Sequence, residues 1–182
     1  MNKITIMKRI SQFISAVIFC LLVSLFTFAE NTDRQTRNTG SFSSIKVSTG
    51  IDLYLEYGST EKVTVESDRN DLEDLITEVK DGTLHIYLKK KLLNLNFNNS
   101  YEVRVTAKKL VSLDASSGAE VKGQNRFQGE GCSITASSGG GACVNASGEL
   151  HARASSGGDI AYKGSPGTLD VEKSSGGRVS KE

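Results

Sequence analysis

Serines followed by glycine are the first residues in this sequence whose type and spacing could do chemistry. The tripeptide Ser-Ser-Gly occurs four times, as Ser116, Ser117, Gly118; Ser137, Ser138, Gly139; Ser155, Ser156, Gly157; and Ser174, Ser175, Gly176. A serine hydroxyl in a glycine-rich loop can be a nucleophile, part of a phosphate cradle, or the corner of a tight turn. The spacing of the other reactive residues distinguishes these roles.

A catalytic serine needs a histidine base within reach and usually a third group that orients the base. The chain holds two histidines, His85 and His151, and neither has a fixed spacing from the four serine pairs. A Gly-x-Ser-x-Gly elbow is absent, and so is the Gly-Lys-Ser/Thr of a phosphate loop. We therefore predict no catalytic and no cofactor-binding residues, and interpret the serines and glycines as structural corners.

The residues around the tripeptides show why a corner would recur. Successive tripeptides are 18 to 21 residues apart. Mostly apolar residues occur at three fixed distances from the first serine of each tripeptide. Three positions before it the sequence has Leu113, Ile134, Ala152 and Val171, and five positions before it Val111, Cys132, Leu150 and Leu169. Five positions after it the sequence has Val121, Ala142, Ile160 and Val179. Each repeat then consists of two short strands joined by a corner, with one apolar face that only a neighbouring repeat can bury. The pattern predicts an all-β solenoid.

Strands are also expected before the repeats. Apolar and polar residues alternate from Ser41 to Tyr57 around Ser48, which aligns with the first serine of the tripeptides. Asp81-Gly82 predicts a hairpin turn. Ser48 and Ser116 are 68 positions apart, and the region between them is expected to be interrupted or irregular and not a series of regular repeats.

The amino terminus has the pattern of an export signal. Lys3, Lys8 and Arg9 precede an apolar run that ends in small residues at Ala29, so residues 1–29 are predicted to be a signal peptide and 30–182 a single domain. An uncleaved anchor helix is the alternative. We expect an exported protein in the periplasm, on the outer surface or secreted, without stable membrane insertion after cleavage.

Charge excludes one class of partner. Removal of residues 1–29 takes away three of the 22 basic residues and none of the 21 acidic ones, which leaves a net charge of −2. Such a chain has no electrostatic reason to bind nucleic acid.

Cysteine and acidic residues could form a disulfide or a metal site. Cys132 falls in an inward column and Cys143 in an outward one, so we expect two free thiols, with an intermolecular bond through Cys143 as the alternative. Asp159 shares its column with Glu120, Gly141 and Arg178, so no metal site is expected. The acidic residues between Asp68 and Asp74 are interpreted as a solvated turn, and Lys89-Lys90-Lys91 as protection of a strand edge.

The opening "FSSIKVSTGIDLYLEYG", the hairpin "TEVKDGTLHIYL" and the Ser-Ser pairs followed by Gly-Ala or Gly-Gly together resemble the head GIN domain family of putative auto-transporter adhesins. The resemblance covers about Thr36 to Glu182. It implies an envelope or secreted protein whose solenoid is a right-handed β-helix-like fold.

Three functions follow from these observations. The first is a non-enzymatic, adhesin-like binding domain that contacts a polysaccharide or a surface protein through outward residues such as Glu120, Asp159 and Tyr57. The second is a structural or assembly module of an envelope complex, with oligomers formed through the solenoid edges. The third, a polysaccharide-cleaving enzyme, is disfavoured because acidic residues do not recur in one column of neighbouring repeats.

Overall fold

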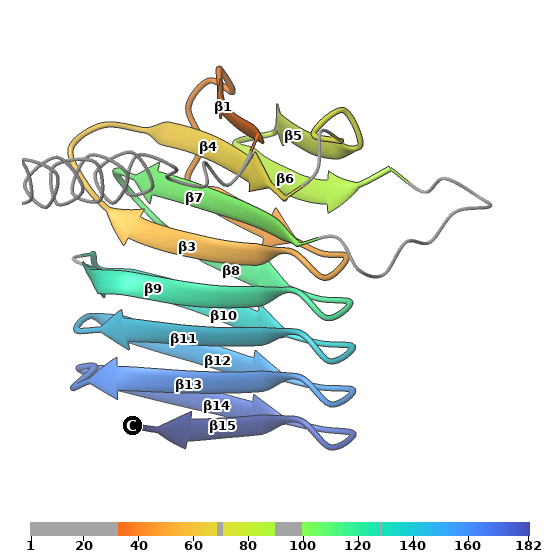
Figure 1. Ribbon diagram of the computed structural model, residues 1–182. Helices are drawn as coiled ribbons and strands as arrows, with labels where there is room; N and C mark the ends of the chain where they lie inside the picture. The colour runs from red at the N-terminus through yellow and green to blue at the C-terminus, as the bar shows by residue number, and fades with distance from the viewer. Residues whose placement is uncertain (1–32, 69–70, 90–99, 128) are drawn as a thin grey trace, which may run out of the picture. The chain divides into compact units, whose positions relative to one another are not determined.

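Alternating apolar and polar residues form strands throughout the described chain. The computed structural model describes residues 33–68, 71–89, 100–127 and 129–182, which form fifteen strands and no helix (Figure 1). Residues 1–29 of the predicted signal peptide lie outside the described residues, as do Lys90 and Lys91. Thr32–Glu182 form one compact unit. The protein is therefore all-β over the described residues, as predicted.

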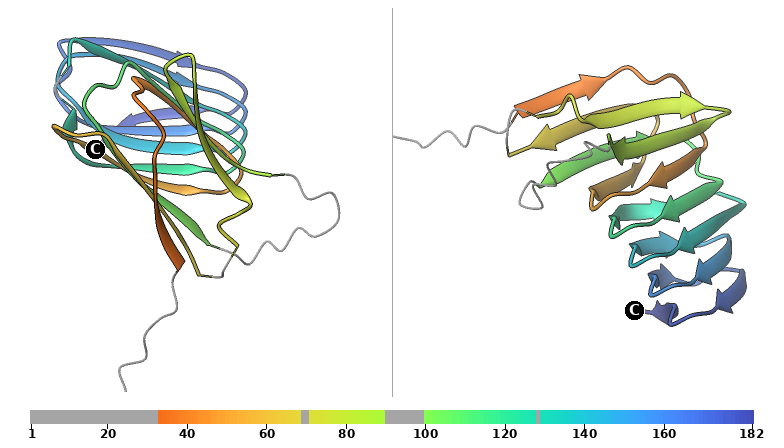
Figure 2. Two further views of the ribbon diagram at one scale, coloured as in Figure 1. Left: turned by 90° about the horizontal axis from the view of Figure 1, so that it is seen from above. Right: turned by 90° about the vertical axis from the view of Figure 1, so that its right-hand side faces the viewer.

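The strands make two mixed sheets that do not close on themselves. The eight-stranded sheet has the order β1 (Asp33–Arg37), β4 (Lys62–Ser67), β7 (Tyr101–Ala107), β3 (Asp52–Tyr57), β9 (Glu120–Phe127), β11 (Gly141–Ala146), β13 (Asp159–Gly164) and β15 (Arg178–Lys181). The seven-stranded sheet has the order β14 (Thr168–Lys173), β12 (Glu149–Ala154), β10 (Gly131–Ala136), β8 (Ser112–Ala115), β2 (Ser44–Val47), β6 (Thr83–Leu88) and β5 (Leu75–Lys80). Figure 2 shows the two sheets facing each other, joined by short turns.

The repeats predicted from the Ser-Ser-Gly spacing pair in parallel. Ile134 on β10 pairs with Ala152 on β12, and Ala142 on β11 pairs with Ile160 on β13, so residues of one column occupy one register. Ser48 also aligns with Ser116 as expected, because Val47 pairs with Ala115 just before them.

The described residues between Ser48 and Ser116 are more regular than the sequence indicated. β6 and β7 extend the two parallel stacks beyond β2 and β3, although they follow them in the chain. β1 and β4 then add antiparallel strands to one sheet, and β5 adds one to the other through the hairpin at Asp81-Gly82, where φ is 49° and 70°. The local hairpin signal is visible in the sequence, but the return of β6 and β7 to the far side of β2 and β3 is a long-range pairing without a local signal.

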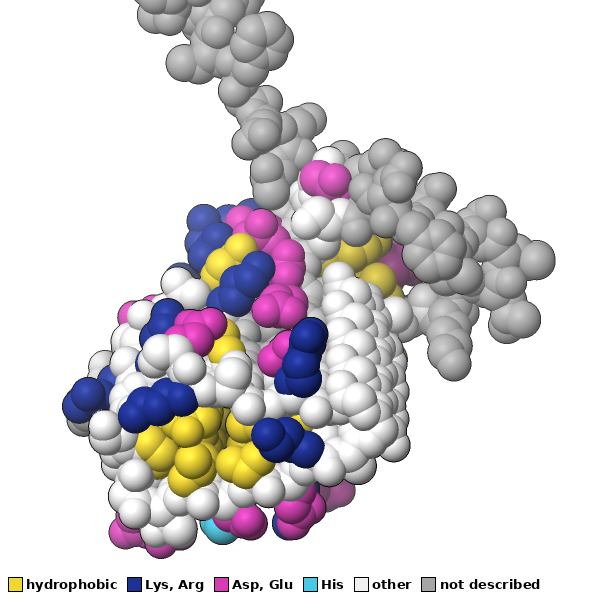
Figure 3. Space-filling view, turned by 90° about the horizontal axis from the view of Figure 1, so that it is seen from below, with side chains coloured by type: hydrophobic (Ala, Val, Ile, Leu, Met, Phe, Trp, Pro, Cys, Tyr) yellow, Lys and Arg dark blue, Asp and Glu magenta, His cyan; other side chains and the backbone are white. Residues whose placement is uncertain are grey.

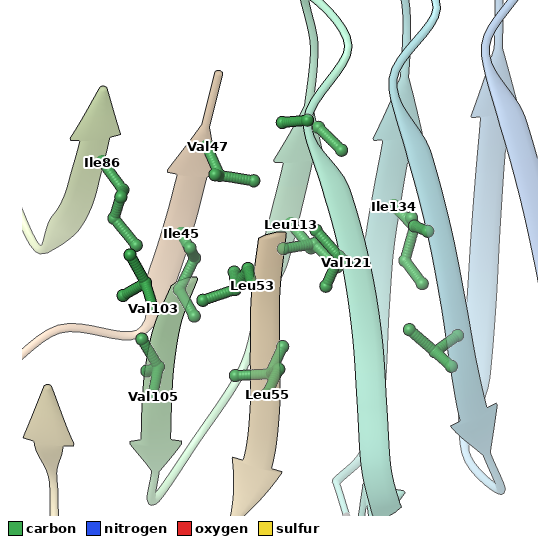
Figure 4. Packing of buried hydrophobic residues seen from close by; sticks show 14 of the residues in the cluster. Ile45, Val47, Leu53, Leu55, Ile86, Val103, Val105, Leu113, Val121 and Ile134 are labelled. Atoms are coloured by element: carbon green, nitrogen blue, oxygen red, sulfur yellow. The ribbon is translucent and has the colours of Figure 1, made fainter. Parts of the chain in front are cut away.

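The hydrophobic core lies between the two sheets. Figure 4 shows Ile45, Leu53 and Leu113 pointing into this space from three strands, and each is at most 1% exposed. Burial of each such side chain contributes roughly 1.5–3 kcal/mol. Val111 was expected in an inward column but is 44% exposed; it precedes β8, and its neighbour Leu110 is buried against the core instead.

Candidate functional surface

The Ser-Ser-Gly tripeptides lie in the turns that connect the two sheets. In each of them the second serine and the glycine have positive φ, for example 51° at Ser138 and 73° at Gly139, which is the requirement of a type I′ turn. The Gly140 amide closes this turn by donating to the Ser137 carbonyl at 2.9 Å.

Main-chain groups also join one turn to the next. The Ser137 amide donates to the Ala115 carbonyl at 3.0 Å, and the Gly139 amide donates to the Ser156 carbonyl at 3.2 Å. Within the described chain the serine hydroxyls of the tripeptides make no hydrogen bond. The turns therefore hold the register of the strands through their backbone.

A serine, a histidine and an aspartate lie on neighbouring strands in the same register, away from these turns. Ser133, His151 and Asp170 occupy one register position on β10, β12 and β14, and His151 Nδ1 lies 3.3 Å from Asp170 Oδ2. The spacing of the histidines from the tripeptide serines gave no sign of this row, because Ser133 belongs to none of the tripeptides.

Two features of the row disfavour catalysis. The side chains of His151 and Asp170 are 43% and 53% exposed, and no hydrogen bond links Ser133 to His151 in the described chain. The row is an exposed polar strip.

Acidic side chains line up across the outer face of the eight-stranded sheet. Glu66, Glu102, Asp52 and Glu120 lie opposite one another on β4, β7, β3 and β9. Adjacent strands are about 4.8 Å apart, so these carboxylates form a continuous row. The sequence showed no such recurrence, because the row passes through the strands that precede the repeats.

Basic side chains of the same face neutralise this row. Arg104 contacts Glu66 at 3.5 Å and Glu102 at 3.1 Å, and Arg34 contacts Glu66 at 3.1 Å. Lys122 lies 3.5 Å from Asp52. We call these residues, together with Tyr54 and Glu120, the ion-pair face.

Tyr54 stands between the two central cations of the ion-pair face. The Arg104 guanidinium lies 4.5 Å and the Lys122 amine 5.4 Å from its ring centroid, within the range of cation–π attraction. Partial burial lowers the pKa of Lys122, but Asp52, Tyr54 and Glu120 outweigh this effect, so that the net pKa is raised. Lys122 is therefore held in its charged form.

The acidic row continues towards β15 in a weaker form. The Glu120 carboxylate fills the space above Gly141, where a Cβ would collide with it. Asp159 comes next in register and pairs with Arg178 at 3.1 Å. The predicted surface residues Glu120 and Asp159 thus share this face.

Tyr57 does not belong to that face. Leu53, Leu55 and Tyr57 have the inward phase of β3, and the Tyr57 ring packs edge-on against Phe127 with centroids 6.3 Å apart. The cavity that these two rings line has a volume of about 20 Å³, room for about one water molecule. Tyr54, with the outward phase, takes the place that we predicted for Tyr57.

The two cysteines of the described chain are free, as predicted. Cys132 packs against the core, and burial raises the pKa of its thiol to about 12. Cys143 lies on the outer face with its Sγ 3.8 Å from Glu182, and partial burial, followed by the Glu182 charge, raises the pKa of its thiol.

Asp71, in the acidic segment that we interpreted as a solvated turn, is held by hydrogen bonds to two neighbouring strands. Asp71 accepts hydrogen bonds from Ser67 at 2.7 Å and from Tyr101 at 2.5 Å. These contacts tie the turn to β4 and β7. No group of three or more metal-ligating side chains gathers anywhere in the described ranges.

The model of the family described as "putative auto-transporter adhesin, head GIN domain" matches residues 41–180. The chain belongs to the head GIN domain family. The match includes β2 to β14 and most of β15, and hence nearly the whole parallel stack and most of the ion-pair face. No curated protein matches the sequence.

This head GIN domain is similar to several solved structures. A putative adhesin from Parabacteroides merdae has 15% sequence identity and a TM-score of 0.52, with 85% of this chain and 97% of that chain covered. A putative adhesin from Bacteroides fragilis has 15% identity and a TM-score of 0.45, covering 85% and 98%. A putative lipid-binding protein from Parabacteroides distasonis has 19% identity and a TM-score of 0.40, covering 85% and 98%.

Among the described residues of this head GIN domain, no helix has the length and hydrophobicity needed to cross a bilayer.

Proposed function

We propose that the protein is an exported, non-enzymatic, adhesin-like domain of the cell envelope that binds an extended polysaccharide on the ion-pair face. Membership of an adhesin family supports the adhesin-like role. The observation that carries the proposal is the row of carboxylates and cations on adjacent strands. A surface protein is the alternative partner.

The chemistry of the ion-pair face suits a hydroxyl-rich polymer. Glu102 and Asp52 are each paired with a cation on the protein itself, so a ligand need not supply charge. Carboxylate oxygens accept hydrogen bonds and guanidinium groups donate them, and both kinds of bond are stronger than those between neutral groups. The regular spacing of the strands offers these groups repeatedly along one direction, which an extended chain with a repeating unit can use.

We further propose that the parallel strands form a right-handed β-helix-like solenoid with Ser-Ser-Gly corners. The common register of the repeats and the bonds between successive turns support this interpretation. In this fold the serines and glycines of the tripeptides are structural, and the corners keep the outer face regular. Export through the signal at residues 1–29 would place that face in the envelope or outside the cell.

A glycan array tests the proposal. The protein lacking residues 1–29 is compared with the double variant Arg104→Gln, Lys122→Gln and with the matched control Lys46→Gln, Arg153→Gln, which removes two ion-paired cations from the other sheet. We expect binding to one polysaccharide class, lost only in the first variant. Equal loss in both variants, or no binding to any glycan, would overturn the proposal, and binding to surface-protein extracts alone would favour the protein partner.

An assembly role is a second candidate function. One observation favours it: Leu169 and Val171 on β14 are 42% and 37% exposed, whereas their partners on β12, Leu150 and Ala152, are fully buried. A partner that covers β14 would bury them in the same way.

A further inference from the structure

The outermost strands of the two stacks, β14 and β15, leave one edge without a neighbour. β14 pairs only with β12, and β15 pairs only with β13. The backbone groups of β14 and β15 that point away from the stack thus have no strand partner in the described chain. Such edges can accept an added strand.

The interior at this edge is partly apolar. Leu169 and Val171 from β14 and Val179 from β15 pair with residues that are fully buried, namely Leu150, Ala152 and Ile160. Figure 3 shows hydrophobic side chains gathered at this end between lysine and arginine side chains. A hollow of about 420 Å³, lined by Lys173, Arg178 and Val179 among others, adjoins them.

Lysines occupy a further inward position on each of the two strands. Lys173 takes the register position of Ala154, and Lys181 that of Tyr162, both of which point inward. Neither lysine forms an ion pair within the described chain. The edge therefore presents an apolar centre with an unpaired cation in the inward column of each strand.

The charges argue against a second copy as the occupant. Two copies joined by this edge would bring four lysines into one apolar interface. Like charges in such a place are costly, and inward-pointing charges are a known means of preventing edge-to-edge association. The complementary surface is a strand whose inward residues are apolar, with a carboxylate opposite each lysine.

We propose that this edge accepts an extended acidic segment of a partner protein, which adds one further repeat to β14 and β15. Its apolar residues cover Leu169, Val171 and Val179, and its carboxylates pair with Lys173 and Lys181. This inference deepens the assembly role proposed above and rests on it. It is independent of the polysaccharide face, whose central residues lie on β3, β7 and β9.

A synthetic peptide, TLSVSESSGGTVSE, is the direct probe. In parallel register with Thr168–Lys181 it places leucine and valine beside Leu169 and Val171, and glutamates beside Lys173 and Lys181. Fluorescence anisotropy of the labelled peptide measures its binding to the protein lacking residues 1–29. The same peptide with lysine in place of both glutamates is the control ligand.

Charge reversal distinguishes specific binding of the peptide from nonspecific binding. We expect Lys173→Glu, Lys181→Glu to weaken binding of the glutamate peptide by about tenfold or more and to favour the lysine peptide instead. Lys108→Glu, Lys109→Glu, at two exposed positions outside this edge, should leave both affinities unchanged. Circular dichroism and thermal melting check that each variant folds.

The outcomes separate the two levels of the inference. Equal affinity of the two peptides, or no binding by either, contradicts the acidic strand. If light scattering then shows an oligomer that Leu169→Ser dissociates, the assembly role survives with a second copy as occupant. A monomer that binds neither peptide contradicts both.

Discussion

Replacement of Gly140 by alanine tests how closely successive turns pack. A Cβ at Gly140 would lie 2.5 Å from the Ala115 carbonyl oxygen and 2.8 Å from the Ser116 nitrogen. Both are backbone atoms of the preceding turn, so no side chain can rotate away. Alanine at this position should push the two turns apart.

The size of the effect follows from two contributions. Overpacking of this kind costs roughly 1–3 kcal/mol. The displaced Ala115 carbonyl also accepts the 3.0 Å hydrogen bond from Ser137, and loss of such a bond adds roughly 0.5–1.5 kcal/mol. We expect Gly140→Ala to destabilise the domain by about 2–4 kcal/mol, or roughly 5–15 °C in Tm for a domain of this size.

Two further glycines provide controls of graded severity. Gly139 has φ of 73°, and no atom lies within 4 Å of the place that a Cβ would take, so Gly139→Ala should cost only the backbone strain of about 1–2 kcal/mol. Gly167 has neither restriction, and Gly167→Ala should be neutral or stabilising by about 0.4–1 kcal/mol. Urea unfolding followed by circular dichroism measures all three. If Gly140→Ala falls within about 0.5 kcal/mol of Gly167→Ala, the turns can relax and the close-packing explanation is wrong.

Three more outcomes are expected. Leu53→Ala, at a fully buried position, should cost about 2–5 kcal/mol in urea unfolding, and a cost no greater than that of Leu169→Ala at the exposed edge would contradict the assigned core. Because the folded state raises the pKa of Cys132 to about 12, the unfolded chain loses this proton first. The contribution of this thiol to the free energy of unfolding should therefore be complete below about pH 8.5 and decline from there to pH 12 by up to about 1.4 kcal/mol per pH unit. Cys132→Ala should lack that part of the decline. If the variant and the parent protein show the same dependence of stability on pH, this explanation is wrong. Iodoacetamide at pH 8, followed by peptide mass spectrometry, should label Cys143 before Cys132, since the latter thiol is buried against the core; the reverse order would contradict their assignment to opposite faces.

The sequence carried much of the information about the repeats. Apolar columns at constant offsets from the tripeptides predicted the paired registers of β8 to β15, because each repeat must present the same face to the same core. The exception is the end of β9, where the register with β11 shifts between Cys143 and Asn145. The separation of Cys132 from Cys143 followed from the alternation of strand residues alone. Both predictions use short-range periodicity, which a single sequence displays.

Long-range pairing accounts for what the sequence did not reveal. Glu66, Glu102 and Asp52 are far apart in the chain, and they form a row with Glu120 only because β4, β7 and β3 precede β9 in the sheet. Tyr57 was placed on the outer face although its spacing from Leu53 and Leu55 gives it the inward phase. The Ser133–His151–Asp170 row was missed because histidines were compared only with the tripeptide serines.

The turns and the ion-pair face are physically linked. The residue after each tripeptide is alanine at 119 but glycine at 140, 158 and 177, and Ile51 takes this place after Ser48-Thr49-Gly50. The side chain at this position is thus large at Ile51, a methyl group at Ala119 and absent from Gly140 onward. At Gly140, Gly158 and Gly177 a Cβ would collide with the backbone of the preceding turn. Since these turns hold neighbouring strands in register, they also determine which outward residues lie opposite one another. A substitution that separates two turns should therefore disturb the alignment of Glu120 with Asp159 across Gly141, even though the substituted residue touches neither carboxylate.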